Sequence, residues 1–434
     1  MSIELISILL LFISFFALLA YGVPVAYSIG ISTTLAIIIN IVFVPGVTTV
    51  AQRMTTGIDS FALLAIPFFV LAGELMNKGG IANRLVNFAK SAVGSLPGGL
   101  GYVNILASML FGAISGSAVA AASAIGSVMT ERMKDEGYPV PFSAAINITS
   151  STTGVLIPPS NVLIVYALAS GGAASVAALF IAGYVPGILM GVALMIVAAI
   201  ISKKKGIARG ERVSLPKLFT DFRRAFFSLL MLFIIVGGIV AGVFTATEAA
   251  AIAVVYAGVL GFFYKDINVA SLPQILLDSA KTTAIVMFLI CTSMAMSWLF
   301  SFESIPQLMT SFLLDKVSNP IAIFLLINIT LLVVGTFMDM TPAILIFTPI
   351  FLPVVTELGM DPVHFGIIMV LNLCIGLCTP PVGTILFVGA GVAKTSVSEI
   401  IKPLIPFLIA MVLTLVLVTF LPSLSLWLPS VFEL

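Results

Sequence analysis

The 434-residue chain has very few charged side chains, and it has little histidine and cysteine. Charged residues make up 9% of the sequence, and hydrophobic residues make up 60%. Soluble domains carry about 25% charged residues. So few charges cannot cover the surface of a water-soluble protein of this length, which excludes a cytoplasmic enzyme, a nucleic-acid-binding protein and a disordered chain. The composition predicts an all-α integral membrane protein with many spans.

The chain has one histidine, His364, and three cysteines, Cys291, Cys374 and Cys378, all in apolar stretches. Cys374 and Cys378 are four residues apart, but no histidine or acidic residue stands near them in the sequence to complete a metal site. An integral membrane enzyme would need a nucleophile with a base, or a set of metal ligands. The sequence offers neither, which weighs against an enzyme.

Eight apolar segments are long enough to be spanning helices, which need about 20 residues. They are 4–20, 24–44, 60–77, 175–201, 225–243, 246–264, 282–300 and 404–428. Four further apolar stretches carry Ser, Thr, Gly and Pro near their centres. They are 103–130, 142–168, 327–355 and 363–390. We expect the first and third of these to be re-entrant hairpins, and the second and fourth to be discontinuous helices that cross the membrane.

The distribution of basic residues supports this arrangement of spans. With two hairpins, all but two of the 19 Lys and Arg residues fall on one side of the membrane. The exceptions are Arg53 and Lys316. Because cytoplasmic loops carry the excess of Lys and Arg, the basic side is cytoplasmic. Both termini are therefore expected on the opposite side.

The first half of the sequence matches residues about 223 positions later. The matched pairs are Pro97 and Pro320, Gly112 and Gly335, Pro139 and Pro362, Phe142 and Phe365, and Gly154 and Gly376. We therefore expect a first repeat over 1–201, a basic cytoplasmic linker over 202–224 and a second repeat over 225–434. Each repeat has an odd number of crossings, so the second is inverted, as in many secondary transporters.

Four breaks in helical structure are predicted within the membrane. They are 115–117 and 154–161 in the first repeat, and 336–342 and 376–384 in the second. Lipid cannot satisfy exposed backbone groups, so each break must face protein or a water-filled cavity. Tight packing and kinking are the alternative role of such residues, but four clusters in repeat-related positions favour binding sites.

The residues at these breaks suit the binding of a cation and of an organic acid. Pro158-Pro159 and Pro380-Pro381 remove backbone donors and leave upstream carbonyls without partners. Together with the Ser117 or Thr379 hydroxyl, such carbonyls can bind a monovalent cation such as Na⁺. The N-termini of the half-helices suit a carboxylate. We expect one cation site in each repeat.

Acidic residues within apolar segments are candidates for function. Asp339 lies at the predicted tip of the second hairpin. We expect it to act in the site there, as a direct ligand, a hydrogen-bond anchor or a proton-coupling group; the alternative is a structural helix cap. We expect Glu248 to be a helix-start residue and Glu74 to pair with Lys78 four positions on.

Two amphipathic segments, 80–96 and 304–318, come just before the predicted hairpins. Each has charges on one face and Leu, Val and Phe on the other, which predicts helices lying along the membrane surface. Such helices could serve as arms between a moving part and a fixed frame.

Several motifs together resemble a known transporter family. They are LLAIPFFVLAGELM, PGGLGY, SGSAVA, GVLIPPSN, FTATEAA, GTFMDMTPAILIFTP and IGLCTPPVG. They are similar to the large membrane subunit of tripartite ATP-independent periplasmic (TRAP) transporters, over nearly the whole chain. No ATP-binding loop of the GxxxxGK[ST] type is present, which agrees with ion-driven transport.

The resemblance implies Na⁺-driven uptake across a bacterial inner membrane by an elevator movement, so the side opposite the cytoplasm, where both termini are expected, is the periplasm. It also implies two partners: a small four-helix membrane subunit, expected here as a separate polypeptide, and a soluble periplasmic binding protein. Family substrates are organic acids, including C4-dicarboxylates, keto acids and sialic acid. The segment STTGVLIPPSN looks most like the sialic acid branch.

The resemblance also implies site residues. The first Na⁺ site would use Ser115, Ser117, Gly154, Val155 and Pro158, with Asn161 nearby. The second would use Gly335, Met338, Gly376, Thr379 and Thr384. The substrate carboxylate would lie near Ser117, Asn161, Asp339, Thr341 and Thr384.

Two other kinds of transport protein stay open at this point. A stand-alone symporter or exchanger of the same superfamily would need no binding protein. An ion channel would need a continuous polar stripe, which the sequence does not show.

Overall fold

In the computed structural model, residues 3–96, 98–207, 214–317 and 319–434 are described, and this described part is built from helices and connections without strands. By length and composition, eight of its helices could cross a membrane, or nine if one bent pair counts as a span. That number includes both helices of the predicted second hairpin, Pro320–Phe337 and Met340–Glu357. The described chain therefore has the helices of a multi-pass membrane protein.

The first half of the chain runs from α1 to α10. The helices are α1 (Ile3–Ala20), α2 (Val25–Asn40), α3 (Phe43–Ile58), the short η1 (Phe61–Leu64), α4 (Ala65–Lys78), α5 (Ile81–Val93), α6 (Gly99–Ser115), α7 (Ala118–Asp135), α8 (Val140–Leu156), α9 (Asn161–Ala169) and α10 (Val176–Lys204). The predicted first hairpin is thus the pair α6 and α7. The predicted first broken helix is α8 followed by α9, which meet at 53°.

The second half runs from α11 to α20. The helices are α11 (Leu215–Val240), α12 (Ala246–Phe263), the short η2 (Val269–Ser271), α13 (Leu272–Phe302), α14 (Ile305–Lys316), α15 (Pro320–Phe337), α16 (Met340–Glu357), α17 (Pro362–Gly376), α18 (Thr384–Ala393), α19 (Val397–Phe420) and α20 (Ser423–Val431). From α13 on, the order of elements is that of α4 to α10. A spanning helix, an amphipathic helix, a helical pair, a broken helix and a long helix follow one another.

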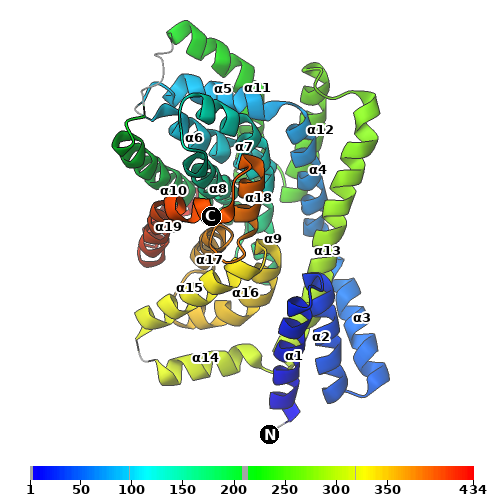
Figure 1. The fold of residues 1–434 in the computed structure, drawn as a ribbon. Coiled ribbons are helices and arrows are strands. Elements are labelled where there is room, and N and C mark those ends of the chain that lie inside the picture. The colour runs from blue at the N-terminus through cyan, green and yellow to red at the C-terminus, as the bar shows by residue number, and fades with distance from the viewer. Residues whose placement is uncertain (1–2, 97, 208–213, 318) are drawn as a thin grey trace.

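The long helix α13 forms a frame with the N-terminal helices, and it contacts α2, α3 and α4. Helix α12 contacts α4 on the same frame. The two amphipathic helices lie at opposite ends of the molecule in Figure 1. Helix α5 lies across the top of the view and α14 across the bottom, both roughly perpendicular to α13. This is the placement expected of arms in an inverted repeat.

Three of the expected segments have clearly different boundaries in the structure. The predicted span 24–44 ends at Asn40, and a separate helix, α3, follows it. Helix α13 begins ten residues before the predicted start at 282, where Asn268 and Ser271 cap each other's backbone in η2. The predicted span 404–428 corresponds to α19, which begins earlier, at Val397, and ends at Phe420, two residues before Pro422.

The basic linker 202–224 is largely helical where it is described. Helix α10 continues to Lys204, and α11 already begins at Leu215, with Ser214 as N-cap and Pro216 in the first turn. Proline is favoured at that position because its missing N–H would be unpaired there anyway. Arg209 and Arg212 of this linker, and the repeat anchor Pro97, lie outside the described residues.

Candidate functional site

The first hairpin turns at Gly116 and Ser117. Gly116 ends α6 with φ +62°, a conformation that glycine adopts without a side-chain clash. Its N–H donates to the Gly112 carbonyl at 2.8 Å. Ser117 then starts α7, since its hydroxyl accepts a hydrogen bond from the Ala120 N–H at 3.2 Å. The tip is therefore a tight turn of polar residues between two helix ends.

The second hairpin turns at Met338 and Asp339. Asp339 is the N-cap of α16, and its Oδ1 accepts a hydrogen bond from the Met340 N–H at 2.8 Å. The capping role considered for Asp339 is thus observed. Asp339 is nevertheless exposed and also lines a cavity. It can therefore interact with a solute in that cavity as well as cap the helix.

Each hairpin meets the broken helix of its own half at a pair of glycines. A Cβ atom added to Gly112 would lie 2.8 Å from the Gly154 Cα, and one added to Gly376 would lie 2.6 Å from the Gly335 Cα. Such short distances mean that the two backbones are in direct contact. A side chain at any of these glycine positions would prevent that contact. The matched positions Thr152 and Cys374 also meet, with Cys374 Sγ 3.4 Å from the Thr152 carbonyl. The same close approach therefore occurs in both halves.

A cavity of about 500 Å³ lies between the two hairpin tips and the frame. Six of the residues proposed from the sequence line it: Ser115, Ser117, Val155, Asn161, Asp339 and Thr341. The other seven do not line it: Gly154, Pro158, Gly335, Met338, Gly376, Thr379 and Thr384. The structure thus gathers the tips and the first broken helix around one space, and leaves all five residues of the second cation set outside it.

The frame supplies a wall that sequence reasoning missed. Glu74 and Asn77 of α4 and Thr282 of α13 line the cavity opposite the tips. The expected pair of Glu74 with Lys78 is absent from the ion pairs of the described residues, which are Arg84–Asp266 and Lys90–Glu136. An acidic residue in an apolar span was the signal that could have identified Glu74. Glu248, in contrast, caps α12 with Thr245 as expected.

The cavity lining is acidic. Glu74 and Asp339 are the charged side chains among the described residues that line it, and that described lining contains no Lys, Arg or His. An organic anion entering this space would meet two carboxyl groups and no basic side chain. A bound cation would remove that repulsion.

The backbone carbonyls at the two breaks differ in their hydrogen bonds, although the Gly154 carbonyl accepts from the Ile157 N–H at 3.2 Å. The residue four positions after Val155 is Pro159, so the Val155 carbonyl lacks its usual helical donor, and Val155 lines the cavity. In the second break, the Gly376 carbonyl accepts from the Thr379 N–H at 2.9 Å, and the Leu377 carbonyl from the Ile385 N–H at 3.2 Å. The Thr379 hydroxyl donates to the Ile375 carbonyl at 2.7 Å but can still accept.

Comparison with known proteins finds one family across the chain. The family described as "Tripartite ATP-independent periplasmic transporter, DctM component" matches residues 12–424. The uncharacterized protein YgiK of Salmonella typhimurium is 54% identical, over 98% of each chain. The C4-dicarboxylate TRAP transporter large permease protein DctM of Rhodobacter capsulatus is 40% identical, over 98% of this chain and 99% of that protein.

A further relative is named for another substrate. The sialic acid TRAP transporter large permease protein SiaM of Vibrio cholerae is 40% identical, over 96% of each chain. The crystal structure of the YdaH transporter of Alcanivorax borkumensis has a TM-score of 0.65 and 15% identity, over 88% of this chain and 89% of that one. At that identity the likeness concerns the fold alone. The similar identities to relatives with different substrates leave the substrate of this chain open.

Proposed function

The chain belongs to the family of DctM components of tripartite ATP-independent periplasmic transporters, which are permeases rather than enzymes, and we propose that it carries an organic acid anion into the cell together with Na⁺. The observation that supports this most directly is the acidic cavity. An anion has no basic partner there among the described lining residues, so its entry is favourable only with cations beside it.

The first Na⁺ would bind near the tip of the first hairpin. The Val155 carbonyl, which lacks its helical donor, and the Ser115 and Ser117 oxygens would be its hard ligands, since these three residues line the cavity. The second Na⁺ would use the Thr379 hydroxyl and the carbonyls near Gly335 and Gly376, after a rearrangement that frees them. Asp339 faces the same space and would add a negative charge close to the ions.

The substrate carboxylate would lie against Ser117, Asn161 and Thr341, between the N-termini of α7, α9 and α16. Sialic acid is the substrate we would test first, because of the STTGVLIPPSN segment. A C4-dicarboxylate is the second candidate, since a relative that bears this name is 40% identical over nearly the whole chain.

We propose that two partners complete the transporter, in line with the word tripartite in the family description. One is a small membrane subunit beside the frame, and the other is a soluble periplasmic binding protein that delivers the substrate. In the movement proposed here, α6 to α9 and α15 to α18 slide as a unit against α4, α12 and α13, with α5 and α14 as arms.

Uptake into proteoliposomes tests the proposal. The vesicles hold this chain with its small subunit, and labelled sialic acid is supplied outside with an inward Na⁺ gradient, with and without binding protein. We expect uptake that needs both the gradient and the binding protein. Uptake without the binding protein would indicate a stand-alone symporter, and uptake driven by a proton gradient alone would contradict Na⁺ coupling.

A panel of substrates separates the function from the choice of substrate. If sialic acid fails but succinate or a keto acid enters with Na⁺, the transport function stands and the substrate assignment is wrong. If no acid in the panel enters, while the purified assembly elutes as a single folded species, the proposed function is contradicted.

A further inference from the structure

The cavity between the hairpin tips has one wall that belongs to the frame, and that wall carries charge. Four residues of α4 line the cavity at the spacing of one helix face: Val70, Gly73, Glu74 and Asn77. A Cβ atom added to Gly73 would lie 2.9 Å from the Ser115 carbonyl oxygen, so this face touches the first tip. The half-buried Glu74 therefore stands on the frame directly beside the tip.

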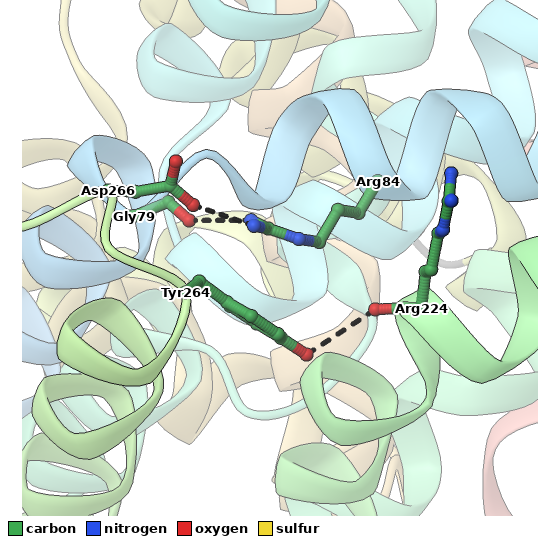
Figure 2. A network of polar contacts seen from close by, with 5 residues as sticks. All are labelled: Gly79, Arg84, Arg224, Tyr264 and Asp266. Carbon is green, nitrogen blue, oxygen red and sulfur yellow. Dashed lines mark hydrogen bonds and ion pairs between the residues drawn. The ribbon is translucent and has the colours of Figure 1, made fainter.

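The end of α4 that presents Glu74 is fixed to the rest of the frame (Figure 2). The carbonyl of Gly79, the C-cap of α4, accepts a hydrogen bond from Arg84 at 2.9 Å. Arg84 also pairs with Asp266 at 2.7 Å and lies 3.8 Å from the centre of the Tyr264 ring, a stabilising cation–π contact. Asp266 and Tyr264 follow α12, which packs along α4. The charge of Glu74 is thus held at a fixed place on the wall.

Asp278 adds a second negative charge near Glu74. It lies on α13, one turn before Thr282, which also lines the cavity. Asp278 and Lys78 are the charged residues whose fields act on Glu74. Lys78 is exposed, and among the described residues it forms no ion pair with Glu74. This part of the frame is therefore acidic where it meets the cavity.

The inverted repeat supplies a counterpart of this wall at the other end of the frame. Helices α4 and α13 end alike, because the second residue after each, Gly80 and Ser304, has a left-handed backbone with φ of +62° and +52°. Counting back six positions from each of them gives Glu74 in α4 and Trp298 in α13. The repeat thus relates a carboxylate near α5 to an aromatic ring near α14.

A basic residue stands beside Trp298. Arg53 of α3 lies over the ring, 5.4 Å from its centre, and its side chain is exposed. In the part of the chain that the structure describes, Arg53 forms no ion pair. Figure 1 shows α4 in the half of the frame toward α5, and α3 in the half toward α14. Related places on the frame therefore carry opposite charge, with Glu74 and Asp278 at one and Arg53 at the other.

We infer that these charges give the frame a direction for an anion, since Arg53 attracts the acid on the α14 side and Glu74 repels it on the α5 side. This inference rests on the proposed function. As the tips slide along the frame, a bound carboxylate leaves the field of Arg53 and enters that of Glu74. The basic residues of the sequence lead us to expect the α5 side in the cytoplasm. The repulsion then falls where the acid is released, lowers its affinity there and hastens its dissociation.

Equilibrium binding of a labelled acid to the purified assembly of this chain and its small subunit tests the role of Glu74. The probe is labelled sialic acid, or labelled succinate if the uptake panel selects it. The test variant is Glu74→Gln, Glu74→Asp keeps the charge, and Glu131→Gln is the matched control. Glu131 of α7 is exposed and does not line the cavity. Binding is measured at constant Na⁺, with and without choline chloride at about 1 M, where the screening length is about 3 Å.

We expect Glu74→Gln to bind the acid about fivefold more tightly without choline chloride, the effect of one charge on another across a water-filled cavity. The gain should shrink with choline chloride, because salt screens the repulsion. Glu74→Asp and Glu131→Gln should bind like the parent. No gain in Glu74→Gln, or a gain that persists at high salt, would overturn the role of Glu74.

The role of Arg53 is tested by uptake into proteoliposomes. Arg53→Gln should lower the initial rate of Na⁺-driven uptake several-fold without changing the affinity measured by binding, and Arg53→Lys, which keeps the charge, should restore the rate. A normal rate in Arg53→Gln, or a defect that vanishes at saturating binding protein, would overturn its role at entry. If the parent takes up none of the acids, the proposed function fails and this inference fails with it. Uptake by the parent that neither charge change affects would overturn this inference alone.

Discussion

Asp339 can be tested for a role beyond capping because asparagine is an equally good N-cap. Asp339→Asn keeps the hydrogen bond to the Met340 N–H but removes the charge that faces the cavity. If Asp339 acts on the ions, the Na⁺ concentration for half-maximal uptake should rise about tenfold, the effect of roughly 1.4 kcal/mol. The measurement is a Na⁺ titration of uptake in proteoliposomes.

Asp339→Ala is the companion variant, because it removes both the charge and the cap. Losing the cap alone should cost about 1 kcal/mol of stability, seen as a lower melting temperature that Asp339→Asn does not share. If the asparagine variant titrates with Na⁺ as the parent does, Asp339 is a cap and nothing more.

The contact between helices α6 and α8 depends on two glycines. A Cβ atom added to Gly154 would lie 2.5 Å from the Gly112 Cα, which is backbone and cannot rotate away. Gly154→Ala should therefore lower stability by about 1–3 kcal/mol, the usual cost of overpacking. The control is Gly258→Ala in α12, where an added Cβ meets nothing within 4 Å. Melting temperatures of the two variants in the same detergent decide the matter, and an equal shift would contradict the close packing.

Helix α4 touches the first hairpin tip at Gly73. A Cβ atom there would lie 2.9 Å from the Ser115 carbonyl oxygen, so Gly73→Ala must push the tip away from the frame. If the tip moves past α4 during transport, this variant should lower the uptake rate several-fold. Its melting temperature should fall less than that of Gly154→Ala, because the closest backbone atom is 2.9 Å away rather than 2.5 Å. A normal uptake rate in Gly73→Ala would mean that transport does not depend on the close contact between α4 and the hairpin tip.

The helix breaks could be predicted from the sequence because their causes are local. Gly116 permits a left-handed turn, and Pro158-Pro159 and Pro380-Pro381 remove backbone donors wherever they stand. The polar residues of the first tip could be assigned for the same reason. Their gathering around one cavity depends on the packing of each hairpin against the broken helix of its half, through glycine contacts that appear only in the structure.

Features that depend on distant contacts could not be predicted. Helix α3 contains Pro45, Gln52 and Arg53 and no long apolar run, and it is held by packing on α2 and α13. The Met54 carbonyl, for example, is 3.2 Å from Cys291 Sγ of α13. Similarly, nothing within α4 indicates that Gly73 and Glu74 would meet the hairpin tip. The frame wall of the cavity is therefore visible only in three dimensions.

The orientation of the protein as a whole follows from where its ends lie. The N-terminal end of the chain lies at the end of the molecule that carries α14, opposite the arm α5 (Figure 1). The C-terminal helix α20 lies beside the start of α17, with Ser425 Oγ 2.5 Å from His364 Nδ1. Helix α17 follows the second hairpin, which is entered from α14. The N-terminal end of the chain therefore belongs to the α14 side, while Arg84 and Lys90 lie on α5 and Arg224 lies on α11, which packs against α5.

Basic residues mark the cytoplasmic side, so the α5 side should face the cytoplasm and both termini the periplasm. A C-terminal alkaline phosphatase fusion should be active and a C-terminal green fluorescent protein fusion dark, because the two reporters fold on opposite sides of the inner membrane. An epitope inserted between α10 and α11 should be reached by antibody only after the membrane is opened. A fluorescent C-terminal fusion would show that the protein has the opposite orientation. In that case the cavity wall formed by Glu74 and Asn77, near the α5 end of α4, would face the periplasm.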